Sequence, residues 1–182
     1  MRKIAAILII FTISFFPLGF SFKTSNTVKA KIKPTEAIEN NEKPISNPYL
    51  DLDKLPEDYN HELAIKNGDV VALHGLGYNV FKLDDFIVGF KNNTLTLGDM
   101  VRVTRYTIEG DPVIFDLVIS DDGASLVIDH TRGKFISPAD KKRVYYKVKD
   151  IFVKRESKRA YYKIITDTGE ELPIATFKDG YF

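Results

Sequence analysis

The chain contains no cysteine. This absence excludes disulfide bonds, thiolate nucleophiles and zinc sites built on cysteine. Neither sign of charge prevails either, because 26 Lys and Arg residues stand against 25 Asp and Glu residues. Such a balance gives no strong field for nucleic acid, so we expect no nucleic-acid partner. The fold must therefore be held by an apolar core, for which 13 Phe and 9 Tyr residues are present.

One long hydrophobic run occupies the beginning of the chain. Residues 4–16 are apolar apart from Thr12 and Ser14, and they follow the basic start Met1-Arg2-Lys3. This pattern predicts a secretory signal peptide over residues 1–21. The alternative is an uncleaved anchor, because residues 4–22 are long enough to cross a bilayer. Either way, we expect an extracytoplasmic protein that is secreted or membrane-anchored at the cell surface, and any membrane contact would come through this segment if it stays uncleaved.

The remainder divides into a polar segment and a folded domain. Residues 22–54 are rich in Lys, Asn, Glu, Ser and Thr and are interrupted by three prolines. Such a composition cannot bury enough apolar surface to offset its ordering entropy, so it predicts a flexible tether. Residues 55–182 are predicted to form a single domain.

The domain is predicted to be α+β, with two helices packed on one face of an antiparallel sheet of about five to seven strands. One helix is expected to begin at Pro56-Glu57-Asp58 and to end at Asn67-Gly68. A second is expected from Asn79, as N-cap, to Asn92-Asn93. The expected strands have alternating apolar residues and cover residues 69–74, 100–108, 113–119, 125–129, 144–153, 161–166 and 172–177.

His74 and Asn79 are candidate binding residues. His74 ends a predicted strand beside Gly75 and Gly77, where a general base or a metal ligand can stand. The alternative is a histidine that caps the strand end by hydrogen bonding. No second His, Cys or clustered carboxylate stands at ligand spacing, and no phosphate loop or nucleophile elbow is present. We therefore expect no cofactor and no metal ion, and we assign a catalytic role to no residue.

Arg105 and Arg132 are the other two candidate binding residues. Together with Arg102 they could gather carboxylates or phosphates if the sheet brings them together. The alternative for Arg105 is an ion pair within the sheet with Glu109, Asp116 or Asp129. The sequence leaves this choice open.

Three stretches of the domain resemble a known family. They are Asn67-Gly68-Asp69-Val70-Val71 with His74-Gly75, then Arg102-Val103-Thr104-Arg105-Tyr106-Thr107-Ile108-Glu109-Gly110-Asp111-Pro112, then Asp129 with Thr131-Arg132. This pattern, over roughly residues 56–166, resembles the DUF4362 family, small exported proteins, many of them lipoproteins, of Bacillus-like Gram-positive bacteria. The resemblance implies export. It implies no activity, and this chain lacks the lipid-accepting Cys and the Cys pair that members commonly carry.

Two functions are consistent with these observations. The first is a non-enzymatic cell-envelope domain that binds a protein, a peptide or an envelope polymer through its sheet and loops. The alternative is a small hydrolase-like envelope enzyme that uses His74 with a nearby carboxylate such as Asp69. A concave pocket that joins His74 to a carboxylate and an arginine would favour the enzyme.

Overall fold

The computed structural model describes residues 47–178 and 180. The predicted signal peptide and the predicted tether up to residue 46 lie outside these residues. In the described part, no helix is both long and apolar enough to cross a membrane.

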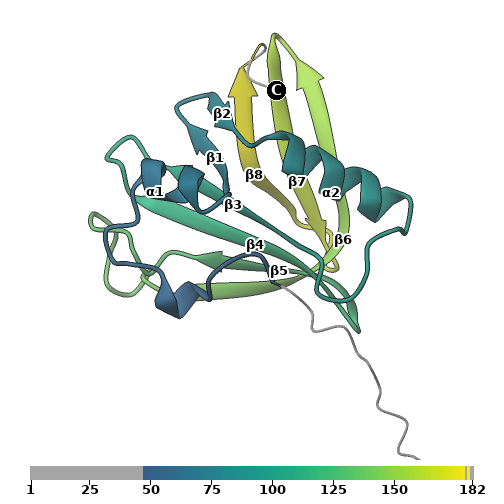
Figure 1. The fold of residues 1–182 in the computed structure, drawn as a ribbon, viewed down its shortest axis with the longest axis horizontal. Helices are drawn as coiled ribbons and strands as arrows, with labels where there is room; N and C mark the ends of the chain where they lie inside the picture. Colours follow the sequence, from purple (N-terminus) through teal and green to yellow (C-terminus); the bar gives the residue numbers. More distant parts are fainter. Residues whose placement is uncertain (1–46, 179, 181–182) are drawn as a thin grey trace, which may run out of the picture. The chain divides into compact units, whose positions relative to one another are not determined.

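Within the described residues, the fold is one sheet with two α-helices (Figure 1). The eight strands lie in the order β2-β1-β3-β4-β5-β6-β7-β8, and every pair is antiparallel except β1 with β3. The strands are β1 (Val70–Leu73), β2 (Leu76–Tyr78), β3 (Met100–Tyr106), β4 (Pro112–Ser120), β5 (Gly123–Asp129), β6 (Arg143–Glu156), β7 (Arg159–Thr166) and β8 (Glu171–Lys178). The helices are η1 (Leu52–Lys54, a 3-10 turn), α1 (His61–Lys66) and α2 (Phe81–Lys91). The predicted α+β class is confirmed.

The sheet has one strand more than the predicted range. The additional strand is β2, whose three residues pair with β1 so that Gly77 lies opposite Ala72. This stretch, with Gly75 and Gly77, is not among the strands expected from the sequence. The prediction failed because three residues are too few to show an alternating pattern, and only the pairing with β1 defines them as a strand.

The sheet curls until its last strand meets its first two. The backbone N–H of Lys178, at the end of β8, donates to the carbonyl of Gly75 between β1 and β2 at 2.9 Å. Figure 1 shows β8 beside the β1–β2 hairpin, although they are far apart in sequence. We call the line along which β8 meets this hairpin the seam.

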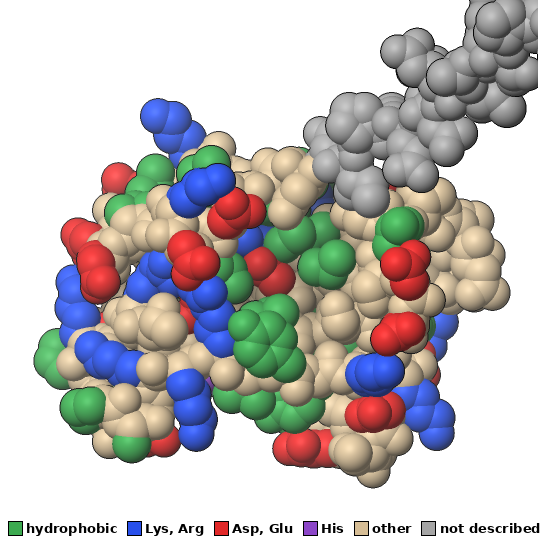
Figure 2. All heavy atoms as spheres, turned by 90° about the horizontal axis from the view of Figure 1, so that it is seen from below, with side chains coloured by type: hydrophobic (Ala, Val, Ile, Leu, Met, Phe, Trp, Pro, Cys, Tyr) green, Lys and Arg blue, Asp and Glu red, His purple; other side chains and the backbone are tan. Residues whose placement is uncertain are grey.

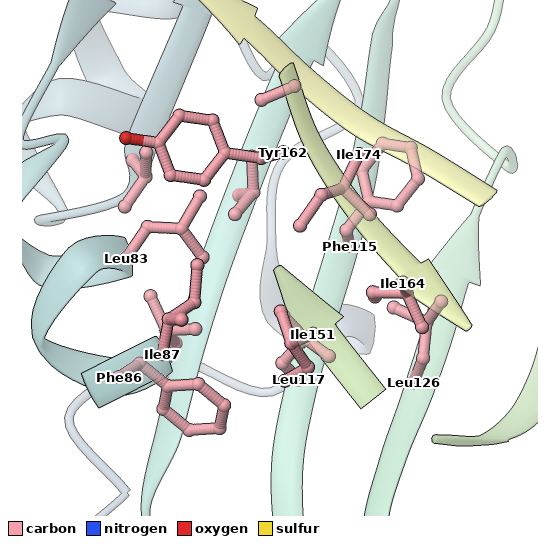
Figure 3. Close-up of a cluster of buried hydrophobic side chains, with 14 of the residues drawn as sticks. Leu83, Phe86, Ile87, Phe115, Leu117, Leu126, Ile151, Tyr162, Ile164 and Ile174 are labelled. Atoms are coloured by element: carbon pink, nitrogen blue, oxygen red, sulfur yellow. The ribbon is translucent and has the colours of Figure 1, made fainter. Parts of the chain in front are cut away.

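The main core lies between α2 and the inner face of the curled sheet (Figure 3). Leu83 and Phe86 of α2 belong to the same buried cluster as Phe115 and Leu117 of β4. The cluster also contains Ile164 of β7, so both halves of the sheet share one core. Buried aromatic and branched side chains of this kind supply most of the favourable free energy of folding.

The two helices pack on opposite faces of the sheet, which corrects the prediction that both lie on one face. Val70 belongs to the main core, whereas the next residue, Val71, packs with Ala64 of α1 and Ile114 of β4 in a second cluster. Successive strand residues point to opposite faces. β1 is apolar on both faces, so each face needs its own cover.

Both helices begin later than predicted. α1 begins at His61, because the side chain of Asn60 accepts a hydrogen bond from the N–H of Leu63 at 3.0 Å. An Asn at the N-cap thus sets the start, and not the Pro-Glu-Asp stretch before it. α2 begins at Phe81 after the N-cap Val80. The predicted helix ends at Asn67 and Asn92 are confirmed.

Candidate functional site

Two adjoining cavities open at the seam. The first has a volume of about 240 Å³ and is lined by residues that include Arg105, Ile108 and Thr176. The second has a volume of about 270 Å³ and is lined by residues that include Arg159 and Lys178. His74, Gly75 and Thr176 line both cavities. We call the two together the seam cleft. It lies where the two ends of the curled sheet meet.

Arg105 is the most enclosed cation of the seam cleft. It lies opposite Ala72 of β1 and Val113 of β4, in a row that continues the inner face of the sheet. Its guanidinium carbon lies 5.1 Å from the centre of the Phe115 ring, and Nη1 donates weakly to the carbonyl of Pro173 at 3.4 Å. The ring contact is a cation–π interaction that holds the head group at the end of the core.

No carboxylate among residues 47–178 forms an ion pair with Arg105. Two of the acids proposed as its partners are engaged elsewhere: Asp116 binds Arg102, and Asp129 binds Arg132 and Arg143. Burial lowers the pKa of Arg105 because it removes water from the guanidinium. The side chain nevertheless keeps its charge at neutral pH. The result is a half-buried positive charge that faces a cavity.

His74 lies at the turn between β1 and β2. Its φ of 50° and the φ of 91° at Gly75 reverse the chain there. A Cβ on Gly75 would lie 3.1–3.4 Å from side-chain carbons of Lys178. Gly75 therefore lets the stem of Lys178 cross the backbone at the seam. The imidazole of His74 is exposed and makes no hydrogen bond with any residue that the structure describes, so it does not cap the strand end.

Arg159 and Lys178 bring further positive charge to the seam cleft. They lie opposite one another on β7 and β8. Like charges placed opposite one another destabilise a sheet. Within the described part of the chain, neither forms an ion pair. Figure 2 shows the contrast on another face, where Lys and Arg side chains are interspersed with Asp and Glu.

Arg132 and Asn79 do not line the seam cleft. Arg132 forms an ion pair with Asp129 at 3.0 Å and donates to the carbonyls of Leu52, Leu55 and Pro56. It thereby binds the segment before α1 to the sheet. The side-chain amide of Asn79 donates to the carbonyl of Asp69 at 2.8 Å, which fixes the turn that leads into α2. Both have partners inside the fold.

The segment before α1 is also bound through Arg102. This arginine forms two hydrogen bonds with Asp116, of 2.6 and 2.8 Å, and donates to the carbonyl of Leu50 at 2.9 Å. Its guanidinium carbon lies 5.2 Å from the centre of the Tyr49 ring. The end of the predicted tether, from residue 47 to residue 54, therefore contacts the domain.

A buried polar cluster lies beneath α1. The Asp69 carboxylate accepts hydrogen bonds from Tyr59 at 2.9 Å and from Thr104 at 2.6 Å, both through Oδ2. Its Oδ1 is buried and has no hydrogen-bond partner. Burial raises the pKa of Asp69 to about 6. This cluster was not predicted from the sequence, although the polar residues Arg102 and Thr104 alternate with valines on β3.

The structure does not join His74 to a carboxylate. Asp69 precedes β1 and His74 follows it, so the two residues are separated by roughly 16 Å of extended chain. No Asp or Glu is among the residues that line either cavity of the seam cleft. Among the described residues, no group of three His, Cys, Asp or Glu is arranged to hold a metal ion. The seam cleft is lined by residues with imidazole, guanidinium, ammonium and hydroxyl groups, which are chemically suited to anions.

The seam cleft joins two predicted residues with three that the sequence did not single out. His74 and Arg105 were candidates, whereas Arg159, Thr176 and Lys178 were not. A family model described as a domain of unknown function, DUF4362, matches residues 67–163. This stretch includes His74, Arg105 and Arg159, while Thr176 and Lys178 follow it. No curated protein and no solved structure matches the chain.

Proposed function

The chain belongs to the DUF4362 family, and we propose that it is a non-enzymatic binding domain of the cell envelope that holds an anionic group of a peptide, protein or envelope polymer in the seam cleft. The observation that carries the proposal is Arg105, a half-buried guanidinium that faces a cavity without a carboxylate partner among the described residues. Desolvation of a charge is unfavourable unless a counter-charge offsets it. A ligand oxyanion supplies that counter-charge.

The geometry of the guanidinium favours an oxyanion as the ligand group. Arg presents a planar fork of N–H donors that matches two oxygens of a carboxylate or phosphate. The contact with Phe115 holds the fork in place, so little side-chain freedom is lost when an anion binds. Thr176 adds a hydroxyl group to the wall of the same cavity.

The cellular location in this proposal comes from the sequence. A basic start followed by an apolar run is typical of an export signal. The polar segment after it would keep the domain near a surface while it remains free to turn. An anionic envelope component would then be within reach of the seam cleft.

The test uses the full chain and purified cell envelopes of the producing organism. We expect the chain to co-sediment with envelopes at low salt, and Arg105→Gln to weaken this binding about tenfold or more, since a charge-assisted hydrogen bond contributes about 1.5–3 kcal/mol. Lys147→Gln is the matched control, because Lys147 is exposed and pairs with Asp122 at the far end of the β4–β5 hairpin. Equal binding by the wild type and Arg105→Gln would refute the proposal.

A further inference from the structure

The seam cleft has two lobes, and each contains its own cationic groups. Arg105 lies in the first lobe. Arg159 and Lys178 lie in the second. The lobes share His74, Gly75 and Thr176 in their walls, so they adjoin one another. Two separate positive centres therefore stand on either side of a shared wall.

The positive charge of the second lobe is imposed by the fold. Arg159 and Lys178 are opposite one another because β7 and β8 pair in this register. The hydrogen bond from the backbone N–H of Lys178 to the Gly75 carbonyl then brings the end of β8 to the turn at His74. Arg159, Lys178 and His74 thus meet only because the sheet closes.

We propose that the seam cleft binds a ligand with two neighbouring oxyanion groups, one on Arg105 and the other between Arg159 and Lys178. This inference rests on the proposed function and adds the number and spacing of the anionic groups. The shared chemistry is a short segment with two oxyanions, found in a diphosphate, in two successive phosphodiesters or in a dicarboxylate. The hydroxyl of Thr176 and the imidazole of His74 lie where the atoms between the two groups would pass.

A ligand with two anionic groups gains from both lobes at once. After the first group binds, the second is held close to its own cations, so its effective concentration is high. The anionic group in the second lobe reduces the repulsion between Arg159 and Lys178. The group in the first lobe gives Arg105 a counter-charge. A single anion can satisfy only one lobe.

The experiment compares simple anions by titration calorimetry on the full chain at low salt. The probes are inorganic phosphate, inorganic diphosphate, acetate and succinate. We expect a clear difference within one of two pairs. Either diphosphate binds at least about tenfold more tightly than phosphate, or succinate binds at least about tenfold more tightly than acetate. Which pair shows this difference identifies the ligand as phosphate-based or carboxylate-based.

Variants assign the two groups to the two lobes. Arg105→Gln should weaken both the one-group and the two-group anions. The double variant Arg159→Gln/Lys178→Gln should lower the affinity for the two-group anion to that of the one-group anion. Lys147→Gln should change nothing. Arg105→Lys keeps the charge without the fork and should restore part of the affinity, which separates loss of binding from loss of folding.

The outcomes separate this inference from the proposed function. If one-group and two-group anions bind the wild type equally and both depend on Arg105, the two-lobe site is refuted and the binding function stands. If Arg105→Gln changes no affinity, for anions or for envelopes, both are refuted. If the double variant leaves the two-group anion unaffected, the second lobe is not part of the site.

Discussion

Asp69 is a buried carboxyl whose protonation is tied to folding. Its folded-state pKa is raised from 3.8 to about 6, mainly because burial removes water from the charged form. Between pH 3.8 and about 6, Asp69 is protonated in the folded state and ionised in the unfolded state. The free energy of unfolding therefore falls as pH rises through this range, until Asp69 is ionised in both states above about 6. The loss amounts to about 3 kcal/mol.

Asp69→Asn should remove this dependence. Asparagine can still accept the hydrogen bonds of Tyr59 and Thr104, but it does not ionise. We expect the stability of the variant relative to the wild type to rise between pH 4 and pH 7, measured by urea unfolding at several pH values. Asp122→Asn is the control, because that carboxylate is exposed. A wild-type-like pH profile in Asp69→Asn would show that Asp69 is charged in the fold.

Phe115 joins the core to the seam cleft. Its side chain is 2% exposed, and its ring carries the guanidinium of Arg105. Phe115→Ala should cost about 3–5 kcal/mol of unfolding free energy, because it leaves a cavity. It should also weaken anion binding in the fraction that remains folded, because Arg105 loses its support. Phe135→Ala should change stability by less than about 0.5 kcal/mol, since that ring is 72% exposed. Equal effects of the two substitutions in thermal and chemical unfolding would contradict the core assignment.

At the scale of elements, the turn between β3 and β4 is structural. Gly110 has a φ of 90°, which a residue with a Cβ resists. Asp111 accepts a hydrogen bond from the N–H of Phe135 at 2.9 Å and so holds a neighbouring loop. Glu109 is exposed and forms no ion pair with a residue of the described chain. Within the turn Glu109-Gly110-Asp111-Pro112, Gly110 and Asp111 therefore have a structural role.

Two substitutions in this turn should differ clearly. Gly110→Val should destabilise the domain by at least about 1 kcal/mol, because a branched side chain disfavours a positive φ. Glu109→Gln should leave both stability and envelope binding near their wild-type values. The measurements are thermal unfolding and co-sedimentation. Loss of binding by Glu109→Gln at unchanged stability would place this turn in the site.

Which elements could be predicted from sequence depends on their length and environment. The long strands β3 and β4 and the helix α2 show repeating apolar positions, so their existence was predicted correctly. β2 has too few residues for any period. The predicted start of α1 was wrong. Pro56 and the acidic residues after it are acceptable at a helix start, but the N-cap hydrogen bond of Asn60 determines where the helix begins.

The candidate site was predictable only where it is local. His74 was noticed because it adjoins a glycine-rich turn, and Arg105 because it stands among apolar residues. Arg159 and Lys178 lie on strands whose alternating charges are typical of a solvated face. Their contact with His74 depends on the closure of the sheet, which no local pattern indicates. For the same reason, the partners of Arg132, more than 70 residues earlier in the chain, could not be foreseen.

At the scale of the whole described domain, closure at the seam is what makes the cleft. Without it, β8 would end as a free edge, and Lys178 would lie apart from His74. The hydrogen bond from the Lys178 N–H to the Gly75 carbonyl, at 2.9 Å, is the backbone contact that joins the two sides. Substitution of Lys178 by proline removes this N–H.

Lys178→Pro should open the seam, and Lys178→Gln separates that effect from loss of charge. Both variants lack the ammonium group, but only proline lacks the N–H. A proline at the end of an edge strand is otherwise tolerated. We expect Lys178→Pro to be less stable than Lys178→Gln by about 0.5–1.5 kcal/mol, the usual net contribution of one hydrogen bond. Amide exchange at Leu73 and Leu76 should become faster only in the proline variant, and its affinity for two-group anions should fall below that of Lys178→Gln. If the two variants match in stability, exchange and affinity, the seam is not held by this bond and the cleft does not depend on closure.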